Sequence, residues 1–172
     1  LTPEELAERQ QAFTALLAEH HDAFARYVHA MARNTEDARD LMGETLLRAY
    51  EAFDTLRDPS SFLYYLITIA KRLHWRIAKR RTLHLPFERK HEDLLVQPAD
   101  AAEMAPDLAA LHRAIARLPE RQRETLVLFE LSGLSLKDIR SLQGGTISGV
   151  KARLVRARRR LAELLGEVPA TD

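Results

Sequence analysis

The segment from Lys151 to Arg160 has the residue types that most clearly indicate chemistry. It carries six cations in ten residues and no acid, namely Lys151, Arg153, Arg156, Arg158, Arg159 and Arg160. Such a density of positive charge repels itself unless an anion neutralises it. Guanidinium groups bind phosphates and the acceptor edge of guanine, so the pattern favours nucleic acid as the partner. The alternative is a solvated basic helix on an ordinary bundle.

Two shorter helices are expected to precede and position this basic segment. Pro119 suits the first position of a helix, because the N–H that proline lacks would be unbonded there anyway. Apolar periodicity continues from that point to Leu131 and stops at Gly133. Ser135 followed three residues later by Asp138 resembles a capping box, which predicts the start of a second helix.

The second helix is expected to end at Gly144-Gly145, and Thr146 can cap a third helix. Apolar residues recur at helical spacing in that third helix, at Ile147, Val150, Leu154, Ala157, Leu161 and Leu165. Helix, tight turn and basic helix form the layout of a helix-turn-helix that reads the major groove of DNA.

A second basic helix is predicted from Phe62 to Arg81. Its buried face is expected to hold Phe62, Leu66, Ile69, Ala70, Leu73 and Ile77. Its polar face carries Lys71, Arg72, Arg76, Lys79, Arg80 and Arg81, with Tyr64, Tyr65, His74 and Trp75 among them. Cations follow phosphates and aromatic faces stack on unpaired bases, so this helix is a candidate for single-stranded DNA. Alternatively, Tyr65 and Trp75 are ordinary core aromatics, and for Tyr64 and Trp75 the sequence leaves both a core position and a nucleic-acid contact open.

The distribution of charge divides the chain. The net charge is +1 overall, but it is −6 over residues 1–60, +7 over 61–90, −5 over 91–112 and +5 over 113–172. Pro86, Pro98 and Pro106 interrupt the acidic stretch. We therefore expect an all-α protein with two small helical domains, 1–82 and 107–172, joined by an acidic linker, 83–106. Such a linker is expected to let the free domains move relative to each other.

Two further helices are expected in the N-terminal domain. The first runs from Glu4 to Met31, with a break expected near His20-His21. The second begins at Asn34 or Thr35, and its charged face carries Asp40, Glu44 and Arg48.

Several function classes find no support in the residues. The chain has no cysteine, which removes disulfides and thiolate chemistry and suits a reducing cytoplasm. Its seven histidines form no HExxH pattern, and Gly144-Gly145 lacks the lysine of a phosphate-binding loop. No apolar run reaches the roughly 20 residues of a membrane span. We therefore expect no catalytic residue, no metal, no cofactor and no membrane insertion.

Motifs along nearly the whole chain resemble one family. Ala38–Tyr50 is similar to the "AEDLVQETFLRAW" helix of extracytoplasmic-function sigma factors, the two-domain initiation subunits of bacterial RNA polymerase. Phe53-Asp54 and Ser60–Ala70 resemble the stretch that follows that helix. Leu118–Glu124, Val150–Leu154 and Arg156-Ala157-Arg158 resemble the C-terminal domain of the family.

The resemblance implies partners and sites. Asp40, Glu44 and Arg48 would contact the clamp helices of the largest subunit of core RNA polymerase. The flap of the polymerase, promoter DNA and an anti-sigma factor would be further partners. The minus-ten promoter element would meet Arg57, Ser60, Tyr64, Lys71, Arg72, Trp75, Arg76, Lys79 and Arg80. The minus-thirty-five element would meet Ser148, Lys151, Arg153, Arg156 and Arg159.

Six residues depart from the family pattern: Gly43, Arg72, Arg76, Arg140, Gly145 and Gly149. Gly43 lies inside the polymerase-docking helix, where glycine costs about 1 kcal/mol relative to alanine. Arg140 replaces a small residue that lets the turn helices pack, and Gly149 is expected to loosen the start of the basic helix. These departures leave open a diverged sigma factor with unusual promoter choice, or a sigma-like protein that no longer initiates transcription. A separate alternative is a stand-alone helix-turn-helix regulator that never contacts polymerase.

Overall fold

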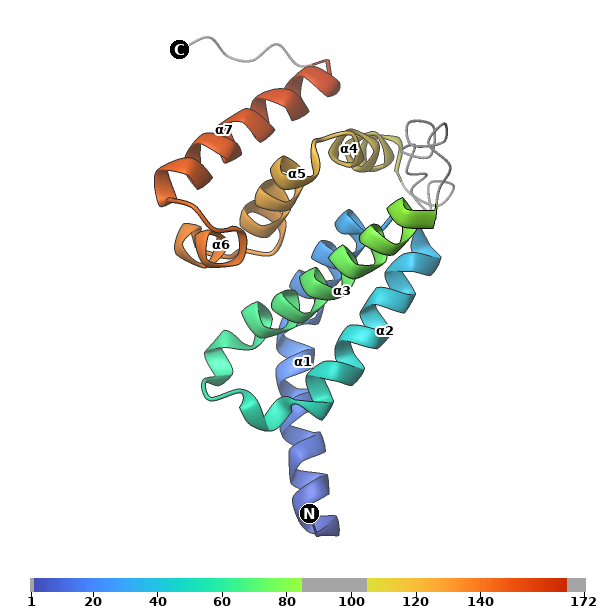
Figure 1. Cartoon of the computed structure of the whole chain (residues 1–172), viewed down its shortest axis with the longest axis vertical. Coiled ribbons are helices and arrows are strands. Elements are labelled where there is room, and N and C mark those ends of the chain that lie inside the picture. The colour runs from blue at the N-terminus through green and yellow to red at the C-terminus, as the bar shows by residue number, and fades with distance from the viewer. Residues whose placement is uncertain (1, 85–104, 167–172) are drawn as a thin grey trace.

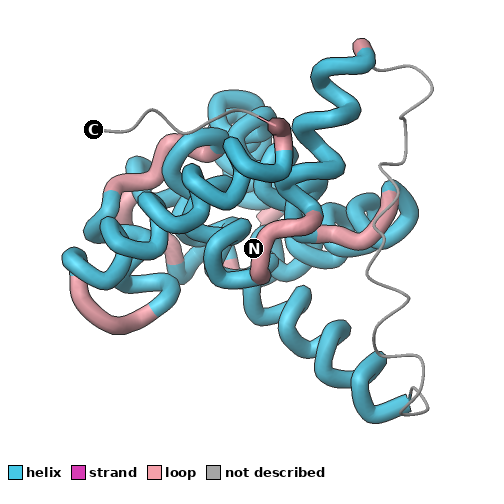
Figure 2. The backbone as a smooth tube through the Cα atoms, turned by 90° about the horizontal axis from the view of Figure 1, so that it is seen from above, coloured by secondary structure: helices cyan, strands magenta, loops and turns pink. Residues whose placement is uncertain are grey.

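The computed structural model describes residues 2–84 and 105–166, and within this part every regular element is helical. The long helices α1 (Pro3–Met31), α2 (Thr35–Glu51) and α3 (Phe62–His84) form the N-terminal bundle. The C-terminal bundle contains α4 (Pro106–Ala116), α5 (Glu120–Leu126), α6 (Leu136–Gln143) and α7 (Ile147–Leu164). Figure 1 shows this second bundle stacked on one end of the first, and Figure 2 shows the same arrangement from above. Most of the predicted linker lies outside the described residues.

Helix α1 is continuous, so the break expected near His20-His21 is wrong. The sequence there contains neither glycine nor proline, and nothing else stops the helix. A capping box fixes its start, because the Glu5 backbone N–H donates to the Thr2 hydroxyl and the Thr2 N–H donates to the Glu5 carboxylate. Its N-terminal turns extend beyond the bundle (Figure 1).

Short 3-10 turns at Phe53–Thr55 and Pro59–Ser61 join α2 to α3. Asn34 caps α2, as one of the two expected alternatives. Near the other end of the hairpin, Arg81 donates two hydrogen bonds to the Asp37 carboxylate at 2.7 and 2.8 Å. The face of α3 that packs on α1 and α2 differs from the prediction at two positions. Ile67 is fully buried, whereas Ile77 is 38% exposed.

The C-terminal bundle contains the expected helix-turn-helix, with one shift at its start. Pro119 has extended backbone angles, φ −52° and ψ 140°, and precedes α5 instead of being its first residue. The chain continues from α5 through a π-helical turn, Val127–Leu131, and then turns at Gly133 with φ +74°. Ser135 caps α6 through the Asp138 N–H, as predicted.

The two bundles share a continuous apolar core. Phe24 and Tyr27 of α1 belong to the same buried cluster as Val127, Leu128 and Ile139 of the C-terminal bundle. The Ser132 hydroxyl also donates to the Ala23 carbonyl of α1 at 3.0 Å. The linker composition predicted independent motion, but in this structure the halves are packed against each other, because the apolar face of α1 in the N-terminal bundle packs on apolar residues of the C-terminal bundle.

Candidate nucleic-acid interface

Two glycines and a cap orient the basic helix α7. Gly144 and Gly145 have φ angles of +78° and +82°, a region that L-residues with side chains avoid. The positive φ angles of these two glycines turn the chain between α6 and α7. The Thr146 hydroxyl then accepts a hydrogen bond from the Gly149 N–H at 3.0 Å. The start of α7 is therefore capped through the Gly149 backbone, and the expectation that Gly149 loosens it stays a prediction.

The apolar seam of α7 decides which of its cations face outward. Val150, Leu154 and Ala157 are buried against α5 and α6. The opposite face is exposed and carries Ser148, Lys151, Arg156 and Arg159, four of the five residues predicted for the minus-thirty-five element. Among the described residues, these three cations have no ion pair. They are therefore available to an anionic ligand.

Arg153 is the fifth predicted residue, and it is only half-exposed. It donates to the Gln143 side-chain oxygen at 2.6 Å, which ties α7 to α6. Burial, with nearby Arg121 and Arg156, lowers the pKa of Arg153 below its usual value. The structure therefore gives Arg153 a contact inside the helix-turn-helix, whereas Ser148, Lys151, Arg156 and Arg159 face outward.

The last cations of the segment have acidic partners. Arg158 pairs with Glu130 and lies 5.6 Å from the Phe129 ring centre, and Arg160 pairs with Glu163 at 3.1 Å. These contacts neutralise two of the six cations on the helix within the protein itself.

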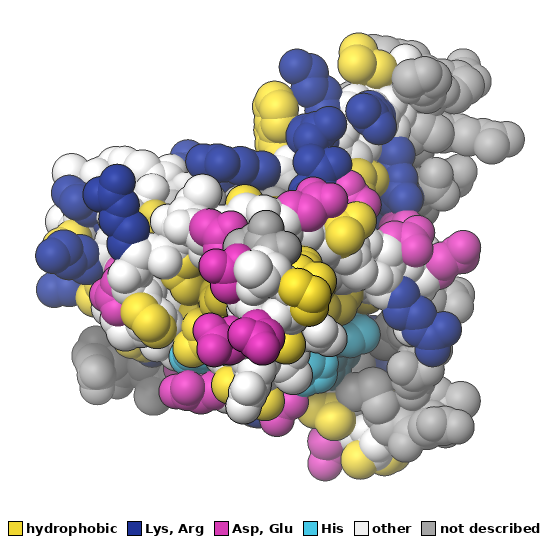
Figure 3. All heavy atoms as spheres, turned by 90° about the horizontal axis from the view of Figure 1, so that it is seen from below, with side chains coloured by type: hydrophobic (Ala, Val, Ile, Leu, Met, Phe, Trp, Pro, Cys, Tyr) yellow, Lys and Arg dark blue, Asp and Glu magenta, His cyan; other side chains and the backbone are white. Residues whose placement is uncertain are grey.

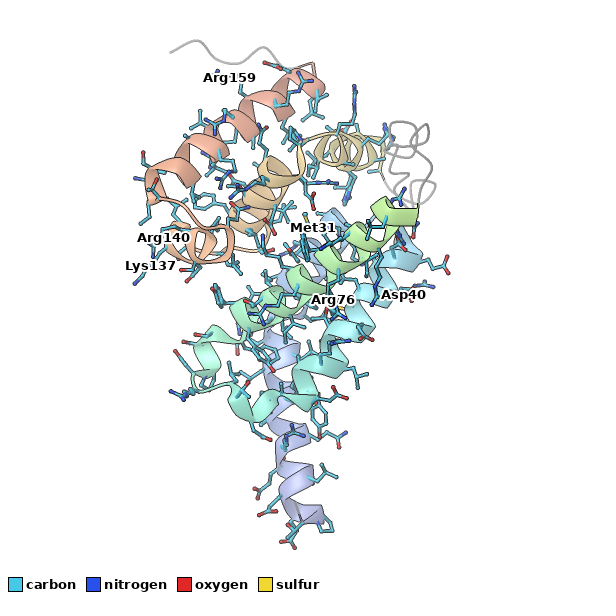
Figure 4. All side chains as sticks on the ribbon, viewed as in Figure 1. Met31, Asp40, Arg76, Lys137, Arg140 and Arg159 are labelled. Carbon is cyan, nitrogen blue, oxygen red and sulfur yellow. The ribbon has the colours of Figure 1, made fainter. Side chains whose placement is uncertain are left out.

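Helix α6 adds two exposed cations beside this face. Lys137 and Arg140 lie on its outer side and point away from the bundle (Figure 4). The buried neighbour is Ile139, so Arg140 does not separate the two helices of the turn as its bulk predicted. Positive charge next to a recognition helix is suited to phosphates flanking the groove.

Helix α3 carries the second basic face. Arg72, Trp75, Arg76, Lys79 and Arg80 are all exposed, and Trp75 is 61% exposed. The Lys79 ammonium lies 5.0 Å from the Trp75 ring centre, a cation–π contact. Figure 3 shows Lys and Arg side chains gathered at separate edges of one face of the molecule, with acidic side chains between them. Cations and a free aromatic ring are the elements that an unpaired strand requires.

Tyr64 differs from Trp75 in its surroundings. It is partly buried and packs against the core of the N-terminal bundle. The sequence left two positions open for these aromatic residues, the core or the surface. The structure places Tyr64 against the core and Trp75 on the surface.

Lys71 is not on an exposed surface in this structure. Its ammonium lies 2.7 and 2.8 Å from the two carboxylate oxygens of Glu124 on α5. Glu124 is 5% exposed and also accepts hydrogen bonds from the Tyr27 hydroxyl at 3.1 Å and the Gln143 amide at 2.8 Å. Burial and the Glu124 charge raise the pKa of Tyr27 well above its usual value. In this packed arrangement Lys71 is therefore occupied by Glu124, and its predicted contact with DNA stays a prediction.

The loop before α3 holds the remaining predicted residues, Arg57 and Ser60, and both are exposed. The Ser60 N–H and hydroxyl donate to the Asp58 carboxylate at 2.9 and 2.8 Å. These hydrogen bonds hold the pKa of Asp58 below its usual value and fix the loop at the start of α3.

Helix α2 presents a charged outer face. Asp40, Glu44 and Arg48 are exposed, and Arg48 pairs with Glu44 at 2.6 Å. Leu47 lies on the same face and is 55% exposed, a contact candidate that helical periodicity missed. Its signal in the sequence is a large apolar residue among charged ones. Gly43 faces open space, and a Cβ at this position would meet nothing within 4 Å.

Two other kinds of site find no support in the described residues. No group of three or more His, Asp or Glu side chains there could hold a metal ion. No helix of the described part is long and apolar enough to cross a membrane.

The fold and these surfaces define a two-part helical DNA-binding protein with a C-terminal helix-turn-helix. Residues 16–83 match the family "Sigma-70 region 2", and residues 108–161 match the family "Sigma-70, region 4". The chain is 32% identical over 165 residues to the ECF RNA polymerase sigma factor SigM of Mycobacterium tuberculosis, covering 94% of this chain and 81% of SigM. It is 32% identical over 162 residues to the sigma factor CarQ of Myxococcus xanthus, covering 92% of each. The chain belongs to the extracytoplasmic-function family of RNA polymerase sigma factors.

Solved structures agree with this assignment. The sigma factor RpoE of Bartonella quintana, solved in complex with the anti-sigma factor NepR, superposes with a TM-score of 0.67 at 26% identity, over 96% of this chain and 98% of RpoE. CnrH, solved with the cytosolic domain of CnrY, gives 0.65 at 26% identity, over 91% and 89%. The chain is thus a sigma factor, which binds core RNA polymerase and directs transcription initiation, and sigma factors are in general not enzymes.

Proposed function

We propose that the three exposed faces divide the work of initiation. The charged face of α2, with Asp40, Glu44 and Arg48, binds core polymerase. The basic face of α3 holds the opened minus-ten strand, and α7 reads the minus-thirty-five duplex. The observation that carries the proposal is the capped helix α7, whose buried seam leaves Lys151, Arg156 and Arg159 exposed.

Promoter binding through α3 has a structural condition. Lys71 reaches DNA only after its pair with Glu124 opens, whereas Trp75 and Lys79 are exposed already. We therefore assign the first contact with the opened strand to the outer residues of α3, and Lys71 to a later one.

The proposed partners are core polymerase, through its clamp helices and flap, promoter DNA and an anti-sigma factor. The two similar solved sigma factors were each captured with a regulatory partner, which supports the last of these. We further propose that the protein has no enzymatic activity of its own and acts in the cytoplasm, where polymerase binds DNA.

Run-off transcription with core polymerase on a promoter library tests the assignment. The wild-type chain should select promoters, and reversing Asp40 and Glu44 to Lys should abolish core binding without weakening duplex binding by the isolated sigma factor. Arg156→Ala should weaken a preferred duplex by about 1–3 kcal/mol, if it contacts a guanine. Arg159→Ala should weaken all duplexes alike and lower the salt slope by about one.

Duplex binding without any transcript, from a chain that does not associate with core polymerase, would favour the stand-alone regulator.

A further inference from the structure

The recognition face of α7 contains one large apolar side chain. Val155 is 51% exposed and lies one helical turn after Lys151 and one turn before Arg159. Ala152, three residues earlier on the same side, is exposed as well. The buried seam of the helix uses Val150, Leu154 and Ala157, so the fold does not need Val155 for packing.

A valine at this position adds only a small packing gain to the folded chain, because about half of the side chain stays exposed. A β-branched residue is a weaker helix former than alanine, and its exposed methyl groups remain in water. A single exposed apolar residue is ordinary on a protein surface. Its position at the centre of a cationic face, on the side that meets the major groove, is what gives it a chemical meaning.

We propose that Val155, together with Ala152, recognises the 5-methyl group of thymine in the minus-thirty-five duplex. This inference rests on the proposed role of α7 and names the base chemistry that it reads. The thymine methyl is the one apolar group that the base pairs present in the major groove, and aliphatic side chains are its partners. Exposed cations beside it supply the complementary contacts to acceptor atoms and phosphates.

The geometry limits which bases these side chains can reach. Ser148 and Val155 are separated by about 10 Å along the helix axis, at 1.5 Å per residue. Base pairs are stacked about 3.4 Å apart, so a stretch of this length lying in the groove reaches only a few of them. Arg156 follows Val155 directly, and we expect the thymine to lie next to the base that Arg156 contacts.

Replacing thymine with deoxyuridine removes this methyl group and no hydrogen-bonding atom. A preferred duplex is first selected from a randomised library with the full-length chain, and each thymine is then replaced singly. One or two replacements should weaken binding by the wild-type protein about three- to fivefold, the value of one buried methyl. Val155→Ala should bind the thymine duplex with a similar loss and should distinguish thymine from deoxyuridine less strongly than the wild type does, because Ala152 still contacts the methyl group.

Leu6→Ala is the matched control, because Leu6 is similarly exposed, at 46%, but lies on α1, outside the proposed binding faces. It should retain the wild-type discrimination. If deoxyuridine at every thymine leaves wild-type binding unchanged while Arg156→Ala still weakens it, α7 reads DNA and the thymine proposal is overturned. If Arg156→Ala also has no effect, the assignment of α7 to duplex DNA fails as well.

Discussion

Replacing Glu124 with Gln tests the buried network that joins the two halves of the protein. The carboxylate accepts hydrogen bonds from Lys71, Tyr27 and Gln143 at distances between 2.7 and 3.1 Å. Glutamine has the same shape but no charge, and its amide group faces at least one of these donors. The substitution therefore weakens a contact between α5 and both α1 and α3.

The expected cost is about 3 kcal/mol of unfolding free energy. Removing one partner of a buried ion pair costs about 3–5 kcal/mol. The Lys71 side chain is 33% exposed and can turn toward water, which places the expected value at the lower end of that range. Replacing both residues with apolar ones, Glu124→Leu with Lys71→Met, should recover part of the loss, because no unpaired charge then remains buried.

Urea denaturation followed by far-UV circular dichroism measures the change. Glu130→Gln is the matched control, since Glu130 pairs with Arg158 on the exposed surface and should cost less than about 1 kcal/mol. Small-angle scattering should also show a larger radius of gyration for Glu124→Gln, as the halves separate. The reasoning is refuted if the two substitutions destabilise the protein equally and the scattering profile is unchanged.

Three other substitutions test separate features. Trp75→Ala should weaken single-stranded DNA binding by about 1–3 kcal/mol and leave the melting temperature unchanged; a lower melting temperature with unchanged binding would make it a packing residue. Asp37→Asn should cost up to about 1 kcal/mol at neutral pH. The hydrogen bonds from Arg81 lower the pKa of Asp37. The stability that the Asp37–Arg81 pair contributes is therefore present above the unfolded-state pKa of about 3.9 and is lost as the pH falls through the folded-state pKa. If the unfolding free energies of the wild type and Asp37→Asn change in parallel with pH, the Asp37–Arg81 pair does not contribute this stability. Gly144→Ala should destabilise the protein by about 1–3 kcal/mol because of the positive φ at this position. Gly43→Ala should stabilise it by about 1 kcal/mol, because alanine is the better helix former and its Cβ meets nothing there. Thermal melts that rank the two variants in the opposite order would contradict both predictions.

Local interactions explain why much of the helix-turn-helix could be predicted from the sequence. The caps at Asn34, Ser135 and Thr146 each act on an N–H three residues away, so their signal lies within a few letters. Gly144-Gly145 likewise marks a turn that side chains would strain. Helical periodicity also placed the cations of α7 opposite its apolar seam.

Only the tertiary structure decided which charged residues are occupied by partners within the protein. Lys71 and Glu124 are 53 residues apart, and their pairing depends on how the two bundles pack. Periodicity shows which residues share a helix face but not which element covers that face. It therefore could not predict that Lys71 pairs with Glu124 while Arg72 stays exposed. The burial of Ile67 and the exposure of Ile77 have the same cause. The sequence by itself determined the helices, the caps and the family, whereas the contact between the halves arose from the complementary shape of distant apolar surfaces around α1.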